Sequence, residues 1–403
     1  MRLHKNLVLA VLNGLHQIFN EDKYADKVVA QLLKSDKRWG SRDRGFVAET
    51  IYEMVRWKRL YTTIAEVQET LNRADLWRVF AVWATLRGYP LPDWNAFKDT
   101  PTRRIKGKFE SLRKERKYRE SIPDWMDQLG VQALGEKKWE KELAVLNTIA
   151  PVVLRTNTLK TLPKLLRNAL LEEKITTQYV PKYDDALVLD ERSNVFSTEA
   201  FQKGLFEVQD AASQCVAPFA EVSPGMRVID ACAGAGGKSL HLAALMKNKG
   251  QLIALDIYLH KLKELKRRAK RAGAHNIETR LIDGNKVIKK LNQSADRVLL
   301  DAPCSGMGVL RRNPDAKWKL NPDFIARITK EQQEILCKYA SMVKPAGKLI
   351  YVTCSILPQE NEKQISTFLD TEAGKEFRLE KQKHYWPSEH GFDGFYMARM
   401  IRK

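Results

Sequence analysis

The sequence lacks any apolar run long enough to cross a membrane, since none of its hydrophobic stretches approaches about eighteen residues. It also lacks low-complexity tracts. With 44% hydrophobic and 29% charged residues, it is typical of a globular protein and not of a disordered one. The amino-terminal stretch MRLHKNLVLAVLNGL has no small-residue cleavage pattern, so we interpret it as the first helix of a domain and not as a signal peptide.

Cysteine is scarce, with five residues in 403, and no two of them form a C-x-x-C pair. An odd number without such pairs argues against a disulfide framework and against a zinc site. We therefore expect a cytoplasmic protein that binds no metal and no membrane. The cysteines are Cys215, Cys232, Cys304, Cys337 and Cys354.

Acidic residues are in short supply, because 49 Asp and Glu face 69 Lys and Arg, which gives a formal charge of +20. This excess favours a polyanionic partner, with RNA or DNA as the first candidate and an acidic membrane surface as the second. Segment 101–120, PTRRIKGKFESLRKERKYRE, holds nine basic and three acidic residues. It has two interpretations, a solvated helix face or a phosphate-binding surface.

The length allows two or three domains, and the first of them, residues 1–145, shows helical periodicity. In the stretch WGSRDRGFVAETIYEMVRWKR, Ser41 is placed to cap a helix on which Val47, Ile51, Met54 and Val55 share one face. We predict an all-helical domain.

The texture of the chain changes at about residue 146. Residues 146–205 contain the extended runs PVVLRTN and TTQYV around one helical pattern, which predicts a small α+β module. In residues 206–403 short apolar runs alternate with helical segments. These runs are MRVID, QLIALD, TRLID, RVLLD and KLIYVT. Such runs suit strands buried on both faces and predict a doubly wound, Rossmann-like α/β sheet.

Four of these five runs end in aspartate, which places carboxylates where ligands of such sheets bind, at the carboxyl ends of the strands. The four are Asp230, Asp256, Asp283 and Asp301. The first strand is followed by DACAGAGGKSLHLAALM, a glycine turn that leads into a helix near Lys238. Glycines there allow close approach to a ligand and expose the amino end of the helix to an anion.

Three ligand classes compete for this turn. A P-loop needs a glycine where the chain has Cys232, and a dinucleotide fingerprint needs one where it has Ser239. An S-adenosylmethionine site gains from Asp256, which lies 20 residues beyond Gly236, the spacing at which a carboxylate accepts the ribose hydroxyls. Asp283 could reach the adenine amino group. A helix cap or a turn explains either aspartate taken alone.

Cys304 and Cys354 stand apart from the other cysteines because they follow neighbouring strands. Cys304 lies in the polar turn DAPCSG, and Cys354 ends a strand in VTCSILPQENE. We expect both thiols to face one cleft. For Cys215 and Cys337, by contrast, a place in the core is the simpler interpretation.

At these residues the sequence resembles the RsmB/NSUN family of RNA 5-methylcytosine methyltransferases, and most closely its RsmB-type ribosomal RNA members. The matching segments are DACAGAGGK at 230–238, ALD at 254–256, DG at 283–284, DAPCSGMGVLRRNPDAKW at 301–318 and TCSILPQENE at 353–362. PVVLRTNTLK at 151–160 resembles the RNA-binding lead-in of the family, and SRDRGFVAETIYEMVRWKR resembles its NusB-like helical domain. One departure is Ala235, where the family's turn has proline, and it bears on cofactor affinity.

The resemblance implies transfer of a methyl group from S-adenosylmethionine to C5 of a cytosine in RNA, through a covalent adduct between a cysteine and C6. By resemblance Cys354 is the nucleophile and Cys304 assists breakdown of the adduct. A carboxyl group near N3 would stabilise the adduct by donating a proton, and Asp301 is the candidate. Lys238 either holds Asp301 or the base, or is a solvated lysine at the start of a helix. The expected cofactor site comprises Cys232, Ala233, Gly234, Ala235, Gly236, Gly237, Lys238, Asp256, Asp283 and Asp301.

The substrate expected from the resemblance is 16S ribosomal RNA, bound by a monomer. Transfer RNA remains an alternative substrate, and a nonenzymatic NusB-like RNA-binding factor and a P-loop hydrolase remain alternative functions. Arg311, Arg312 and Lys317 are expected to meet RNA phosphates, whereas Trp318 is expected to pack and not to stack on a base.

Overall fold

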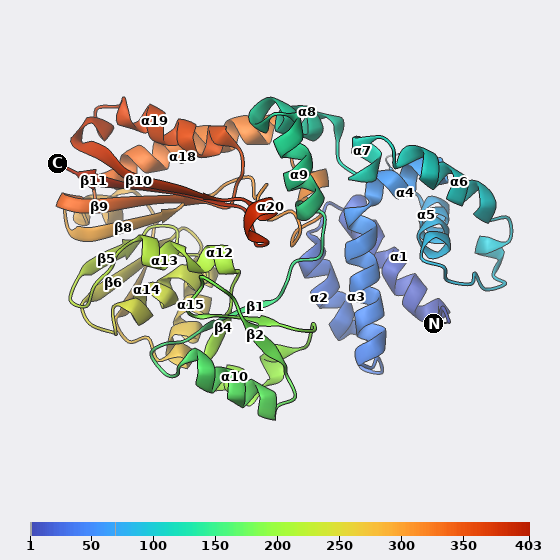
Figure 1. The fold of residues 1–403 in the computed structure, drawn as a ribbon, viewed down its shortest axis with the longest axis horizontal. Coiled ribbons are helices and arrows are strands. Elements are labelled where there is room, and N and C mark those ends of the chain that lie inside the picture. The colour runs from blue at the N-terminus through green and yellow to red at the C-terminus, as the bar shows by residue number, and fades with distance from the viewer. Residues whose placement is uncertain (1, 69) are drawn as a thin grey trace. The chain divides into compact units, whose positions relative to one another are not determined.

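The computed structural model describes residues 2–68 and 70–403, which divide into two compact units (Figure 1). The helical unit extends to Thr148 and also contains Leu310–Pro322, and the sheet unit contains Ile149–Val309 and Asp323–Lys403. Segment 310–322 follows the Cys304 turn in sequence but belongs to the helical unit. Within the described ranges, no helix combines the length and the hydropathy needed to cross a bilayer.

The elements of the helical unit are all helices, as the sequence predicts for residues 1–145. They are α1 Lys5–Phe19, α2 Ala25–Ser35, α3 Ser41–Arg56, α4 Lys58–Ala65, α5 Arg73–Leu86, α6 Thr102–Leu112, α7 Arg116–Arg119, α8 Asp124–Leu134, α9 Glu136–Leu146, the short η1 Asn95–Phe97 and, from the inserted segment, α17 Ala316–Lys319. The predicted apolar face of α3 is buried in the core of this unit.

The cap of α3 differs from the prediction. Ser41 is the first helical residue and Gly40 is the N-cap, so the Ser41 hydroxyl caps nothing. Instead the Asp43 carboxylate reaches back and accepts a hydrogen bond from the Gly40 amide, with 3.1 Å between Oδ2 and N. A carboxylate in the first turn also interacts favourably with the helix dipole.

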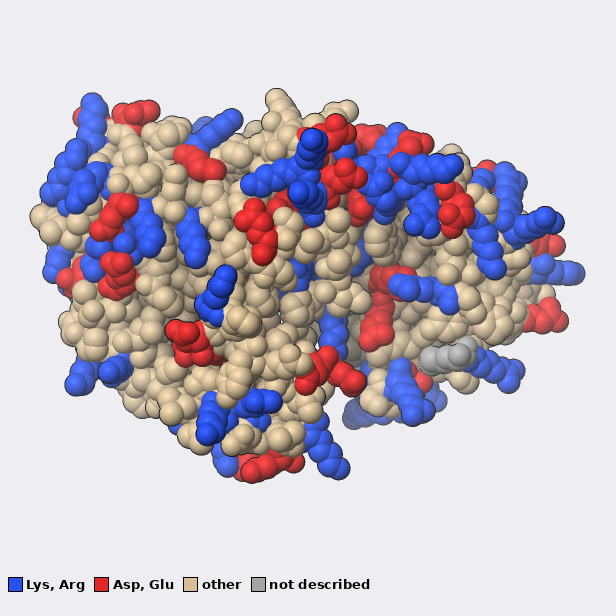
Figure 2. Space-filling model, viewed as in Figure 1, with Lys and Arg blue, Asp and Glu red and all other residues tan. Residues whose placement is uncertain are grey.

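The basic segment 101–120 forms α6 and α7, and many of its cations are already paired. Arg104 and Lys108 both contact Glu66, Arg116 contacts Asp127 at 2.8 Å and Arg119 contacts Glu140 at 2.5 Å. On the face drawn in Figure 2, Lys and Arg lie among Asp and Glu over these helices and form no uniform basic patch. This arrangement favours a solvated, ion-paired surface.

The sheet unit holds two sheets. The smaller one is antiparallel, in the order β2-β3-β1-β4, and it contains both runs expected to be extended. Its elements are β1 Val153–Thr156, β2 Thr177–Tyr179, β3 Ala186–Leu189 and β4 Phe206–Val208, with η2 Val195–Ser197 and the helices α10 Pro163–Glu172 and α11 Glu199–Gln202.

The larger sheet has seven strands in the order β10-β11-β9-β8-β5-β6-β7. The five predicted strands are parallel, and two carboxyl-terminal strands extend the sheet beyond β9. Strand β11 pairs antiparallel with β9, and β10 pairs antiparallel with β11, so β10 runs in the same direction as the five predicted strands. The strands are β5 Arg227–Asp230, β6 Gln251–Asp256, β7 Ile277–Leu281, β8 Ala295–Asp301, β9 Val343–Thr353, β10 Phe377–Tyr385 and β11 Phe395–Arg402. The predicted Rossmann-like sheet is confirmed.

Helices cover both faces of the larger sheet (Figure 1). On one face α12 Ala211–Gln214, α13 Val216–Phe219, α14 Gly237–Leu245 and α15 Leu259–Ala272 enclose one apolar core. On the other face a second core involves α16 Asn285–Lys290, α18 Pro322–Ala340 and α19 Glu362–Leu369. The remaining short elements are η3 Pro358–Glu360, η4 Gly374–Glu376 and α20 Pro387–His390. Because both faces are buried, the polar groups of this sheet gather at the strand ends.

Candidate active site

The glycine turn connects β5 to α14 and places two residues in the left-handed region. Gly234 has φ +54° and Gly236 has φ +88°. A Cβ at Gly236 would lie 2.5 Å from Leu265 Cγ, so the helix behind the turn also requires a glycine there. Ser239 occupies the third position of the dinucleotide pattern, and its hydroxyl donates to Asp230 Oδ2 at 2.6 Å. Burial raises the pKa of Asp230 to about 7.

Asp256, at the end of β6, holds the turn from the side. Its Oδ2 accepts from the amide of Gly234, and its Oδ1 accepts from the amide of Tyr258, each at 2.8 Å. A carboxylate has about four lone-pair positions, so these two bonds leave capacity for hydroxyl donors. Asp256 therefore acts in the turn, as one interpretation held, and retains the acceptors that a ribose would need.

The two cysteines meet at the ends of adjacent strands. β8 and β9 pair in parallel with Asp301 opposite Val352, so the residues that follow each strand emerge at one edge of the sheet. Cys304 Sγ and Cys354 Sγ lie 3.2 Å apart, within hydrogen-bonding distance for sulfur. The hydrogen bond to Cys354 and burial raise the pKa of the Cys304 thiol well above its ordinary value. The prediction that both thiols share one site is confirmed in geometry.

Lys238 and Asp301 form an ion pair beside these thiols. Lys238 Nζ, from α14, lies 2.5 Å from Asp301 Oδ2, and only 12% of the lysine side chain is exposed. Burial lowers the pKa of Lys238, but the Asp301 carboxylate and, more weakly, Cys354 outweigh burial, so that the pKa is raised. The ammonium is thus a fixed positive charge near the thiol of Cys354.

A buried carboxylate joins the two cysteine turns from behind. Glu360 is fully buried and accepts from Ser305 Oγ at 2.5 Å, Ser305 N at 2.7 Å, Ser355 Oγ at 2.6 Å and Gln332 Nε2 at 3.0 Å. Each of these serines directly follows one of the two cysteines. The segment PQENE, residues 358–362, is part of the family resemblance but has no role assigned from sequence. Within it, Glu360 is the residue whose hydrogen bonds hold the two cysteine turns together.

Replacing Glu360 with alanine is expected to lower the free energy of unfolding by about 3 kcal/mol, because it leaves buried donors without an acceptor. The measurement is urea denaturation. Glu362→Ala is the matched control in the same motif. Its carboxylate pairs with His384 and is 41% exposed, so its loss should cost less than about 1 kcal/mol. Equal losses for the two variants would contradict a special role for Glu360.

Of the other expected cofactor residues, Cys232 and Ala233 belong to the glycine turn, whereas Asp283 follows β7. Cys232 is packed against the core of the sheet, and burial raises the pKa of its thiol well above the ordinary value. The amide of Ala233 donates to Leu255 O at 2.8 Å, which fixes the turn to β6. Asp283 is exposed, two residues beyond β7, and its contact with adenine stays a prediction. Cys215 and Cys337 pack partly buried against the two cores, as expected.

The expected phosphate contacts of the inserted segment are wrong for two residues. Lys317 is 1% exposed, and its ammonium donates within the helical unit to Arg56 O at 2.8 Å, Ser121 O at 2.9 Å and Asn147 Oδ1 at 2.9 Å. Arg311 is 3% exposed. Neither side chain is available to RNA.

For the other two residues of this segment, the expected phosphate contact of Arg312 is untested and the expected packing of Trp318 is confirmed. Arg312 is half-buried, and its phosphate contact stays a prediction. Trp318 packs as predicted, since it lies against the core of the helical unit and its indole donates to Val55 O at 2.7 Å.

Several polar side chains of segment 151–160 are also buried. Arg155 and Asn157 are 3% and 6% exposed, and their side chains bind backbone carbonyls of the sheet unit. Asn157 Nδ2 donates to Gly204 O and to Ala272 O, each at 2.8 Å. These two residues therefore connect the smaller sheet to the larger one. RNA binding by the segment as a whole stays a prediction.

Comparison with known proteins yields two family models. The model described as 16S rRNA methyltransferase RsmB/F matches residues 219–401, and a ferredoxin-like domain model of the RsmF/B type matches residues 122–196. The first covers the larger sheet together with both cysteine turns.

Curated relatives carry related names. The probable ribosomal RNA small subunit methyltransferase B of Bacillus subtilis is 34% identical over 300 residues, which cover 70% of this chain and 67% of that protein. The corresponding protein of Synechocystis is 36% identical over 253 residues, 62% of this chain and 56% of that one. The ribosomal RNA small subunit methyltransferase B of Pseudomonas putida is 29% identical over 400 residues, 94% of this chain and 86% of that one.

Solved structures resemble the fold. PH0851 superposes with a TM-score of 0.84 at 26% identity over 99% of both chains. A methyltransferase homolog protein from Pyrococcus horikoshii has a TM-score of 0.61 at 27% identity, covering 68% of this chain and 94% of that one. NSun6 from the same organism, solved with SFG, matches in fold with a TM-score of 0.65 at 20% identity, over 71% of this chain and 99% of that one.

Proposed function

The chain belongs to the RsmB/F family of 16S rRNA methyltransferases, and we propose that it methylates C5 of a cytosine in 16S ribosomal RNA. As a member of this family it is an S-adenosylmethionine-dependent RNA methyltransferase. The atom methylated, the RNA and the covalent route are the proposal. The observation that carries it is the pair of thiols, 3.2 Å apart, beside a lysine–aspartate ion pair at the edge of the sheet.

A thiol is what methylation at C5 requires, because C5 of cytosine is a weak nucleophile. When the Cys354 thiolate adds to C6, a carbon–sulfur bond forms and C5 acquires the character of an enamine carbon. Two groups favour this thiolate. The Lys238 ammonium interacts with it electrostatically, and the Cys304 thiol, which keeps its proton because its pKa is raised, donates a hydrogen bond to it.

The ion pair of Lys238 and Asp301 manages the proton at the base. Addition to C6 places negative charge on the ring, and a proton at N3 neutralises it. In the resting ion pair the proton resides on the lysine, because the carboxylate that faces it raises the lysine pKa. We therefore assign proton delivery to the pair. Asp301 contacts the base and passes the proton to N3, and Lys238 supplies that proton to Asp301.

The glycine turn and the strand-end carboxylates form the cofactor site. S-adenosylmethionine supplies an electrophilic methyl group when it is bound. The left-handed glycines bring the backbone close to a ligand, the start of α14 offers amides to its carboxylate, and Asp256 keeps acceptor capacity for its ribose. The family's other candidate residues, Cys232, Ala233, Asp283 and Asp301, complete this proposed site.

The thiol must reach C6, and a paired base within a helix does not expose that atom. The target cytosine is therefore unpaired or flipped out of its stack. We propose that residues 1–145 and 146–205 position the RNA, and that residues 206–403, acting in a monomer, carry out the reaction.

The test uses two reactions, each with the purified chain and methyl-labelled S-adenosylmethionine. One contains an unmodified transcript of 16S ribosomal RNA, and the other contains an unmodified transfer RNA transcript. We expect label at one cytosine of the ribosomal RNA, mapped at nucleotide resolution. Label in transfer RNA alone would contradict the substrate assignment. Binding of RNA without any transfer would favour the nonenzymatic alternative.

A further inference from the structure

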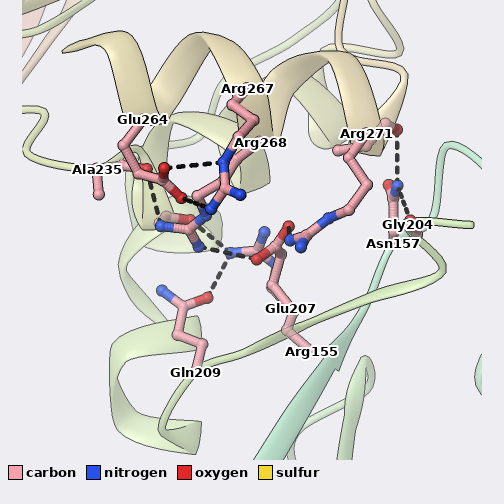
Figure 3. Close-up of polar contacts among 12 residues, drawn as sticks. Arg155, Asn157, Gly204, Glu207, Gln209, Ala235, Glu264, Arg267, Arg268 and Arg271 are labelled. Carbon is pink, nitrogen blue, oxygen red and sulfur yellow. Dashed lines mark hydrogen bonds and ion pairs between the residues drawn. The ribbon is translucent and has the colours of Figure 1, made fainter. Parts of the chain in front are cut away.

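A partly buried network of arginines lies behind the glycine turn (Figure 3). Arg268, on α15, donates through Nη1 to the carbonyl of Ala235 at 2.8 Å and through Nη2 to Glu207 Oε2 at 2.9 Å. Arg271, one turn further along the same helix, binds Glu207 Oε1 at 2.5 Å. Only 5% of the Glu207 side chain is exposed, so this carboxylate fixes both guanidinium groups in a largely desolvated place.

A second arginine reaches the same turn from the smaller sheet. Arg155, on β1, donates to the carbonyl of Gly237 at 2.6 Å and also binds Gln209 Oε1 (Figure 3). Burial lowers the pKa of Arg155 to about 10, while the Glu207 carboxylate opposes that change. The carbonyls on either side of Gly236 are thus each held by a cation.

Holding these carbonyls fixes the orientation of the amides. A peptide unit is planar and trans, so an anchored carbonyl sets the direction of the N–H on its opposite side. Anchoring Ala235 O orients the amide of Gly236, which donates to Ala233 O at 2.9 Å and closes the turn. Anchoring Gly237 O orients the amide of Lys238, in the first turn of α14. Amides in the first turn of a helix have no partner within the helix and are the groups that an anionic ligand meets.

The anchored residue is Ala235, and by the resemblance described above the family's turn has proline at this position. Proline would stiffen the turn by fixing φ, whereas alanine leaves it freer. The amide of Ala235 donates to no other described residue, so a proline ring would displace no hydrogen bond of the turn.

We propose that Arg268, clamped by Glu207, is a positioning residue for the cofactor turn and supplies the rigidity that proline would otherwise give at position 235. This inference rests on the proposed function, because it assumes that the turn binds S-adenosylmethionine. If Arg268 positions the turn, a proline at 235 should compensate for loss of the arginine. If Arg268 only packs, the proline should not compensate.

The experiment is a double-mutant cycle of Arg268→Met and Ala235→Pro, read by calorimetric titration with S-adenosylmethionine in the absence of RNA. We expect Arg268→Met to weaken binding about tenfold, the equivalent of one charged hydrogen bond. Adding Ala235→Pro to Arg268→Met should restore most of the loss, and Ala235→Pro alone completes the cycle. Hydrogen exchange of residues 232–239 should rise in Arg268→Met and fall again in the double variant.

Arg267→Met is the matched control. This neighbouring arginine is 78% exposed and pairs only with Glu264 among the described residues, so its loss should leave affinity and exchange unchanged (Figure 3). Arg271 remains on Glu207 in Arg268→Met and keeps that carboxylate compensated. Should the variant nevertheless unfold, Arg268→Lys serves in the same cycle.

Two outcomes would overturn the proposal. In one, the double variant binds as weakly as Arg268→Met alone, which would mean that the arginine merely packs. In the other, Ala235→Pro alone abolishes binding. Because no RNA is present, these results are independent of whether the chain methylates the substrate assigned to it. A folded wild-type chain that does not bind S-adenosylmethionine would instead contradict the proposed function.

Discussion

Replacing Cys354 with alanine is expected to lower methyl transfer by at least about 10⁴-fold, because the covalent route has no other group placed to add to C6. Cys304, 3.2 Å away, is a poor substitute, since the hydrogen bond to Cys354 and burial raise the pKa of its thiol and keep it protonated. The measurement is single-turnover transfer of label into RNA with enzyme in excess.

The loss should appear in chemistry and not in folding or cofactor binding. Cys354 is only half-buried and directly follows β9, so a methyl group in place of the thiol disturbs little. Cys337→Ala is the matched control, because that residue packs on α18 outside the cysteine turns and should retain full activity. Residual transfer by Cys354→Ala within tenfold of wild type would refute the assignment of this residue as nucleophile.

Much of the sheet unit could be predicted from sequence because its strands are buried on both faces. Runs such as QLIALD and RVLLD have the apolar character that only a central parallel strand requires, and each is confirmed as β6 or β8. Strands β10 and β11 were not predicted. β10 is an edge strand whose central residues are exposed, so its sequence, FRLEKQKHY, carries no strand-like apolar run.

The strand-end residues were predictable because parallel strands bring their carboxyl ends to one edge. This rule predicts that Cys304 lies near Cys354. The rule says nothing of groups behind the turns. Glu360 acts through hydrogen bonds to residues far from it in sequence, which no local pattern signals.

Basic residues were the least predictable class. A charge excess predicts a polyanionic partner, but it does not tell which cations face that partner. Lys317 is expected from sequence to meet RNA phosphates, yet it is buried and its ammonium binds backbone carbonyls. Arg155, in the segment that resembles the RNA-binding lead-in, is likewise buried and binds a backbone carbonyl. A long cationic side chain with several donors suits the task of tying distant segments together, and this competes with phosphate binding wherever carbonyls are left without partners.

Replacing Cys304 with alanine is expected to trap a covalent complex between the chain and its RNA. Addition of Cys354 to C6 does not need the second thiol, but release does. After methylation the C5 proton passes to solvent water, and the electrons of the C5–H bond form the C5–C6 double bond. The carbon–sulfur bond then breaks and its electron pair returns to Cys354 Sγ. A protonated Cys304 thiol at 3.2 Å stabilises that departing thiolate with a hydrogen bond. Without it, elimination slows and the adduct accumulates.

The trapped species should migrate as a protein–RNA band on a denaturing gel, carry label from S-adenosylmethionine and disappear in the Cys304→Ala, Cys354→Ala double variant. Cys215→Ala should give no such band. This cysteine packs against the core on the face of the larger sheet that α12 to α15 cover. If the band formed with Cys354→Ala instead, the roles of the two cysteines would have to be exchanged, since the thiol that remains in a trapped complex is the one that attacked. A geometry with both sulfurs in contact permits either order, so this comparison decides which thiol bonds to the base and which one releases it.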